Sequence, residues 1–193
     1  MSPPNVSDAK IGTLEYHRLF YPHFKCDSTV NKFVVPIIPS YHEILFPDKQ
    51  PQLSLFTSSA VGNAIKQAYL CHARISGIQP GDILLFYRSH DQMAITSIGI
   101  VESTNEFKDA DKIMQLVSKR TVYSYDDIIA MAKKKTKVVL FRLASHLPKT
   151  IKYKSLLKEK IVNGPIQTIR WISDEAFKKI ITYGKIDNCF YAD

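Results

Sequence analysis

Two apolar segments separated by a short polar turn are the feature that most constrains the fold of this chain. The first, DILLFYRS, covers 82–89 after a turn at Gly81, and the second, MAITSIGIVEST, covers 93–104. A turn this short joins antiparallel strands as a hairpin, because parallel neighbours need a crossover of about a dozen residues or more. The pair therefore argues against a doubly wound parallel sheet.

The remaining periodicity predicts strands and helices that do not alternate strictly. Further strands are expected at 33–38, 137–147 and 166–173, and Pro36 should confine the first to an edge or an end of the sheet. Helices are expected at 40–46 (capped by Ser40), 60–75, 109–119, 124–137, 153–159 and 174–183. This order predicts an α+β fold, with a small mixed or antiparallel β-barrel flanked by helices.

The segment 60–75 is assigned to a helix because its larger side chains recur at helical spacing. Ala68, Tyr69 and His72 fall on one helical face, together with Val61 and Ile65. Adjacent residues on a helix point about 100° apart, so the neighbours Cys71 and His72 are not expected to form a catalytic pair.

Length and composition indicate one globular domain. The 193 residues are 45% hydrophobic and 11% aromatic, which is ordinary for a folded protein. We expect an N-terminal tail and docking segment at 1–30, the main domain at 31–185 and a C-terminal tail at 186–193.

The charge distribution favours a polyanionic partner. The formal net charge is +8, and from Ser97 onward there are 18 Lys/Arg against 11 Asp/Glu, compared with 8 and 7 before it. A basic surface suits nucleic acid, because each phosphate that it neutralises releases counterions.

Cysteine and histidine usage gives no sign of a disulfide framework, a metal or a cofactor. The three cysteines are far apart, with no CxxC pair, and the six histidines show no metal-ligand spacing. No P-loop or GxGxxG motif occurs. With no signal-peptide core and no apolar run near the roughly 20 residues of a membrane span, a cytoplasmic protein without a membrane partner is expected.

Aromatic and hydrogen-bonding side chains near the hairpin suggest a nucleobase pocket. A base that is unpaired or flipped needs stacking surfaces and hydrogen bonds to its edge. The expected pocket residues are Asn63, Gln67, Tyr87, Ser89, Gln167 and Trp171. The expected phosphate contacts are Lys66, Arg88, Lys119, Arg120, Lys133, Lys134, Lys135 and Arg170.

Three motifs resemble the EVE-type domains of the PUA-like superfamily, which are relatives of the YTH and ASCH domains. They are GNAIKQA at 62–68, GDILLFYRS at 81–89 and SIGIVES at 97–103. The resemblance implies a small PUA-like barrel with flanking helices that binds RNA or a modified base in DNA, usually without catalysis. It carries pocket roles onto Asn63, Gln67, Tyr87 and Ser89, while Tyr41 and Phe46 would replace a tryptophan that such readers often have near the first strand.

The N-terminal part extends this resemblance to a particular context. The segment 20–47 is similar to PUA-like domains found downstream of acetyltransferase domains in some prokaryotic, toxin-like proteins. That similarity implies an acetyltransferase-type or antitoxin protein as a partner. The alternative function is an RNA-directed nuclease or nucleotide hydrolase of ASCH-like or toxin type, for which the candidates are His42, Lys66, Tyr87, Arg88 and His90.

Overall fold

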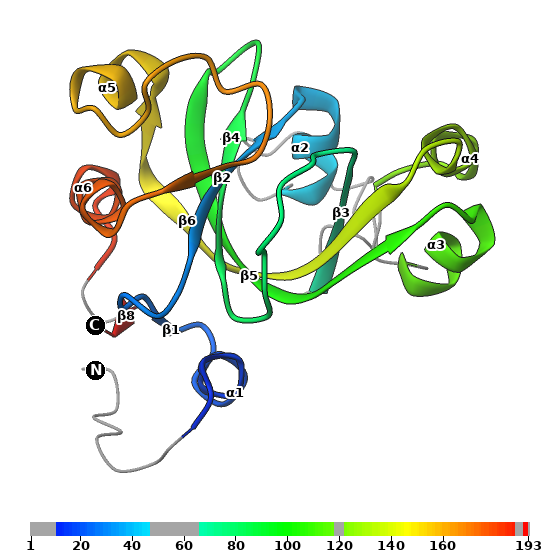
Figure 1. Cartoon of the computed structure of the whole chain (residues 1–193). Helices are drawn as coiled ribbons and strands as arrows, with labels where there is room; N and C mark the ends of the chain where they lie inside the picture. Colours follow the sequence, from blue (N-terminus) through cyan, green and yellow to red (C-terminus); the bar gives the residue numbers. More distant parts are fainter. Residues whose placement is uncertain (1–10, 47–65, 118–121, 188–190, 193) are drawn as a thin grey trace, which may run out of the picture.

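A computed structural model describes residues 11–46, 66–117, 122–187, 191 and 192, and confirms an α+β fold (Figure 1). The main sheet has six strands in the order β3-β6-β5-β4-β2-β7, and only the β2–β4 pair is parallel. These strands are β2 (Lys32–Ile37), β3 (Lys66–Cys71), β4 (Ile83–Arg88), β5 (Ala94–Phe107), β6 (Thr136–Lys152) and β7 (Arg170–Ile172).

The predicted hairpin lies at the centre of this sheet. β4 and β5 pair antiparallel, with Ile83 opposite Ile100 and Arg88 opposite Ala94. Every residue of β4 is buried, because both faces of the strand are covered. Burial on both faces explains the uninterrupted apolar run in the sequence.

The sheet curls around an apolar interior. Register shifts interrupt the β4–β5 and β5–β6 ladders, and such bulges bend strands. Phe33, Phe86 and Phe141 point into the interior from three different strands. The hydroxyl of Tyr69 on β3 donates to the carbonyl oxygen of Pro36 on β2, 3.0 Å away, so the curl brings β3 towards β2.

Helices cover the outside of the curled sheet in two groups. α5 (Tyr153–Lys158) and α6 (Asp174–Gly184) lie on one side, whereas α3 (Ala110–Val117) and α4 (Tyr125–Ala132) lie together at the other end (Figure 1). α2 (Pro39–Leu45) contributes Leu45 to the interior core. Ser124 and Asp127 form a capping box at the start of α4, and Ser173 caps α6.

An ion pair holds the N-terminal segment to the main sheet, and a short strand pair joins it to the C-terminal residues. Arg18, on α1 (Thr13–Leu19), lies 2.8 Å from the buried carboxylate of Glu102. β1 (Phe24–Lys25) pairs in parallel with β8 (Tyr191–Ala192), so part of the segment expected as a C-terminal tail is a strand. The predicted domain boundaries themselves stay a prediction.

A buried lysine joins α6 to the sheet. Lys32 on β2 is fully buried, and its Nζ lies 2.6 Å from both the carboxylate of Asp174 and the carbonyl oxygen of Asp27. Removing one partner of such a pair leaves an uncompensated charge, at a cost of about 3–5 kcal/mol. The start of α6 is therefore fixed electrostatically as well as by apolar packing.

The predicted helix at 60–75 is wrong over all of its described residues, since 66–71 form strand β3 and 72–75 belong to no helix or strand. Tyr69 and Cys71 face the interior core, whereas Ala68 and Leu70 pack against α3 and α4. With both faces covered, the strand reads as a continuous apolar run that periodicity does not separate from a helix. Residues 60–65 lie outside the described part of the chain.

Three local predictions need correction. Pro36 does not lie in an edge strand, because β2 is paired on both sides, with β4 and with β7. β7 pairs only with Lys32–Val34, so among the described strands none needs the backbone N–H that proline lacks. The residue before α2 is Ile38 rather than Ser40, and Pro39 occupies the first turn, where a missing N–H is tolerated. In the expected strand 166–173 only β7 is paired.

Gly99→Ala should destabilise the protein. A Cβ at this position would lie 2.8 Å from the ring of Phe141 and 3.0 Å from that of Phe86, both fully buried. We expect a loss of about 1–3 kcal/mol of unfolding free energy in chemical denaturation, as for other overpacked cores. Gly164→Ala is the matched control, since a Cβ there meets nothing within 4 Å. Equal stability of the two variants would contradict this packing.

His17 should make stability depend on pH. The ring is buried, its Nε2 accepts a hydrogen bond from the backbone N–H of Lys25 (2.8 Å), and burial lowers its pKa to about 4. The unfolded state, with a pKa near 6.5, takes up a proton first, so this contribution is complete above pH ~6.5 and is lost as pH falls towards 4.

We expect wild type to lose about 2 kcal/mol more unfolding free energy than His17→Gln between pH 7 and pH 5. The measurement is urea denaturation at both pH values. Parallel pH profiles for the two proteins would show that His17 does not carry this dependence.

Candidate functional site

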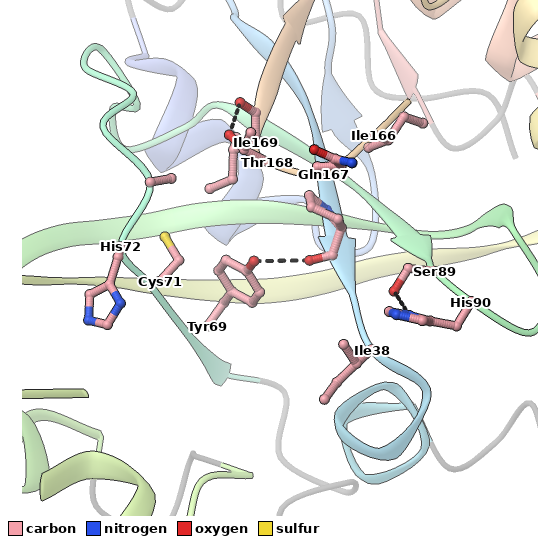
Figure 2. Close-up of a pocket in the computed structure, with 12 residues that line it drawn as sticks. Ile38, Tyr69, Cys71, His72, Ser89, His90, Ile166, Gln167, Thr168 and Ile169 are labelled. Carbon is pink, nitrogen blue, oxygen red and sulfur yellow. Dashed lines mark hydrogen bonds between the residues drawn. The ribbon is translucent and has the colours of Figure 1, made fainter. Parts of the chain in front are cut away.

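A cavity of about 510 Å³ opens where the curled sheet does not close (Figure 2). β3 and β7 are the two edge strands of the main sheet, and the cavity lies between β3, the ends of β2 and β4, and the segment that precedes β7. We call it the seam cavity. Its lining residues are Pro36, Ile38, Tyr69, Cys71, His72, Ala73, Ser89, His90, Ile166, Gln167, Thr168 and Ile169.

The inner wall of the seam cavity is apolar and rigid. Tyr69 and Ile169 belong to the interior core, and Pro36 is part of β2. The Tyr69 hydroxyl is occupied by the carbonyl oxygen of Pro36 (Figure 2), and burial raises the pKa of this phenol well above its usual value. Tyr69 therefore stays neutral and presents a ring rather than a donor.

Ser89 and His90 form a hydrogen-bonded pair at the cavity edge. The Ser89 hydroxyl donates to the carbonyl oxygen of Ile37 (3.0 Å) and lies 2.8 Å from Nδ1 of His90 (Figure 2). With the serine proton directed at the carbonyl, Nδ1 of His90 can donate to the hydroxyl oxygen, and in that tautomer Nε2 is an acceptor. His90 is exposed and has a left-handed φ of 63°, which turns it out of the strand.

The segment 166–169 supplies the opposite wall. Gln167 and Thr168 are exposed, and the Gln167 amide makes no hydrogen bond with the described part of the chain. The guanidinium of Arg170 donates to the carbonyl oxygens of Gly164 (3.3 Å) and Pro165 (2.6 Å). Arg170 thus braces the turn that leads into this wall.

The cysteine and the histidine in the cavity do not form a nucleophile and base. Burial raises the pKa of the Cys71 thiol, which keeps it protonated. The Nε2 atom of His72 lies 3.0 Å from the carbonyl oxygen of Met131 and 3.1 Å from the Thr136 hydroxyl. The histidine is thus engaged by the α4 end of the molecule.

A second chain of polar side chains lies in the interior, beneath α2. His42 Nε2 lies 2.7 Å from the Thr96 hydroxyl, and the Ser97 hydroxyl lies 2.8 Å from Nδ1 of His146. Phe46 packs on both histidine rings, and Thr96 and Ser97 are fully buried. These hydrogen bonds link α2 to β5 and β6.

Two of the six predicted pocket residues, Ser89 and Gln167, line the seam cavity. Tyr87 is buried on the other face of the sheet, 6.4 Å from the ring of Tyr153, and Gln67 is buried with its amide donating to the carbonyl oxygen of Leu45. Neither lines the cavity. Trp171 is 58% exposed on β7, outside the lining, and Asn63 lies outside the described residues.

Four of the six predicted phosphate contacts that the structure describes already have protein partners. Arg88 is held by the carboxylates of Glu43 (2.6 Å) and Asp91, and Arg170 braces the turn. Lys135 pairs with Glu106, and Lys66 lies 4.0 Å from Glu102. Lys133 and Lys134 are exposed, whereas Lys119 and Arg120 lie outside the described residues.

The residues that sequence reasoning missed are mostly apolar. Tyr69, Ile38, Ile166 and Ile169 line the cavity, and nothing distinguishes them in the sequence from ordinary core side chains. A strand assignment for 66–71 would have placed Tyr69 on the same face as Cys71. Among the described residues, no cluster of three or more His, Cys, Asp or Glu could hold a metal ion, and no helix is long and apolar enough to span a membrane.

Comparison with known proteins gives matches in structure only. Neither a scan against family models nor a search of curated proteins finds a match. The ASCH protein of Zymomonas mobilis superposes with a TM-score of 0.58 at 14% identity, over 78% of this chain and 94% of that one. Protein Atu2648 of Agrobacterium tumefaciens superposes with a TM-score of 0.50 at 14% identity, over 85% of this chain and 99% of that one.

Human THYN1, in a complex with DNA that contains 5-methylcytosine, has a TM-score of 0.45 at 11% identity, over 81% of this chain and 99% of that one. A likeness of this degree carries no argument about function. At these identities the comparisons establish the fold alone, and they agree with the resemblance seen in the sequence motifs. The chain has the PUA-like fold of the Zymomonas mobilis ASCH protein.

Proposed function

We propose that this protein is a nucleic-acid-binding module that takes an unpaired or flipped base into the seam cavity. The observation that carries the proposal is an apolar cavity with hydrogen-bonding groups at its edge. Ser89 and His90 stand on one side and Gln167 on the other. A nucleobase has the matching chemistry, with apolar faces and a polar edge.

The size and the walls of the cavity suit such a ligand. Its volume of about 510 Å³ lies within the roughly 300–1,000 Å³ of typical small-ligand sites. The Tyr69 ring and the side chain of Ile169 offer apolar contact to the base faces. The Gln167 amide can both donate and accept, and His90 Nε2 can accept, so the base edge would be recognised by its pattern of donors and acceptors.

Trp171 would extend the site to a neighbouring base. Side chains alternate along an extended segment, so Trp171 lies on the same side as Ile169, which lines the cavity. Its indole is 58% exposed, and stacking of a base on an aromatic ring contributes about 1–3 kcal/mol. RNA, or DNA with a modified base, remains the proposed ligand class.

The cellular location and the binding partners of the protein are also part of the proposal. The net charge of +8 favours a polyanion, and a cytoplasmic location stays a prediction from the sequence. An acetyltransferase-type or antitoxin partner stays a prediction from the N-terminal resemblance. The candidates for the hydrolase alternative do not gather at the cavity: of the five, only His90 lines it, while Tyr87 is buried in another core cluster and Arg88 is held by Glu43 and Asp91.

The double variant His90→Asn/Gln167→Ala should weaken and broaden base recognition. Asparagine tolerates the left-handed φ of residue 90, so the backbone is preserved. Loss of two hydrogen bonds should lower affinity for the preferred oligonucleotide about tenfold, with a smaller loss for other sequences. The measurement is titration of single-stranded RNA and DNA oligonucleotides, with and without modified bases.

Gln115→Ala, at an exposed position of α3, is the matched control and should bind as wild type does. Thermal unfolding of each variant separates a binding defect from a folding defect. Failure of wild type to bind any oligonucleotide at low salt would refute the proposed function.

A further inference from the structure

Lysines are concentrated in the segment 149–160, at the end of β6 and along α5. Five lysines and one glutamate occur in these twelve residues. All five lysines are exposed. None of them forms an ion pair with any residue that the structure describes, whereas Lys25, Lys32 and Lys135 each pair with a carboxylate.

Three of these lysines lie together. Lys154 and Lys158 are four residues apart on α5, so they share a helix face. Lys149 and Lys158 both line a groove of about 140 Å³ between the end of β6, α5 and α6. Like charges at this spacing repel, at a cost of a few tenths of a kcal/mol for each pair. A polyanion would relieve that repulsion.

The groove also contains neutral hydrogen-bond donors. The hydroxyl groups of Ser155 and Tyr183 line it beside the lysines. The only carboxylate in the lining is that of Glu159, and its hydrogen bond with Tyr183 raises the pKa of that phenol. The Tyr183 hydroxyl is thus engaged by Glu159, whereas the lysine ammonium groups and the Ser155 hydroxyl are groups of the kind that bind phosphate oxygens.

α5 is attached to the turn that carries the edge of the seam cavity. The backbone N–H of Tyr153 donates to the carbonyl oxygen of Met93 (2.7 Å), and Lys152 Nζ lies 3.1 Å from that of Gln92. The same turn begins with Ser89 and His90. A single-stranded nucleic acid whose base entered the cavity beside His90 could continue over this turn towards Lys154.

We infer that the face formed by Lys149, Lys154 and Lys158 binds the phosphate backbone of a single-stranded nucleic acid whose base occupies the seam cavity. The inference rests on the proposed function and assigns affinity and base selection to two different parts of the molecule. The lysine face supplies affinity that falls with salt and is insensitive to sequence. The cavity supplies the choice of base.

The test compares two triple variants with the same change of charge. Lys149→Gln/Lys154→Gln/Lys158→Gln removes the proposed face, and Lys112→Gln/Lys133→Gln/Lys134→Gln removes three exposed lysines of the α3–α4 end. Each protein is titrated with a single-stranded RNA oligonucleotide over a range of salt concentrations. Thermal unfolding checks that both variants are folded.

The first variant should lose about tenfold in affinity at low salt, and the slope of log K against log salt should become shallower by about 2, because each phosphate contact contributes ~0.7 on a single strand. Its preference between bases should not change. The second variant removes Lys133 and Lys134, which the sequence offered as phosphate contacts, and so tests that competing location directly. If the inferred face carries the contacts, this variant keeps the wild-type slope and affinity.

Equal slopes for wild type and the first variant would overturn the lysine face. If His90→Asn/Gln167→Ala still weakened binding in that case, the cavity proposal would stand without it. A shallower slope in the second variant alone would move the phosphate contacts to the α3–α4 end and overturn the inference. Absence of wild-type binding would overturn both proposals.

Discussion

The main sheet curls without closing, and the rest of the structure depends on that gap. β3 and β7 are its edges, and the hydrogen bond from the Tyr69 hydroxyl to the carbonyl oxygen of Pro36 ties β3 to an interior strand instead of to β7. The cavity lies in the space left beside this bond. The proline makes the arrangement possible, since a residue with an N–H there would leave a donor without a strand partner.

Much of the fold could be predicted from local signals. The β4–β5 hairpin, the capping box of α4 and the serine cap of α6 are each encoded by neighbouring residues, and all three are present. β3 was mistaken for a helix because a strand covered on both faces has no alternating pattern. β2 is an interior strand because it pairs with β7, and these two strands are far apart in the sequence.

The site was less predictable than the fold, because it too depends on contacts between residues that are far apart in the sequence. Ser89 and Gln167 were found because polar side chains next to apolar strands stand out in a sequence. Tyr87 precedes Ser89 by two residues, but β4 ends at Arg88, and the two side chains have different surroundings. Arg88 pairs with Glu43, which is 45 positions away in the sequence, so this ion pair could not be predicted from residue spacing.

The wall formed by residues 166–169 lies outside the strand ladder, because β7 begins only at Arg170. Its exposed side chains, Gln167 and Thr168, shape the cavity without supporting the barrel. Under the proposed function, the base is selected by residues that the strand ladder does not need. Substitutions at Gln167 and Thr168 would then change what the cavity binds while the barrel beneath is inherited unchanged.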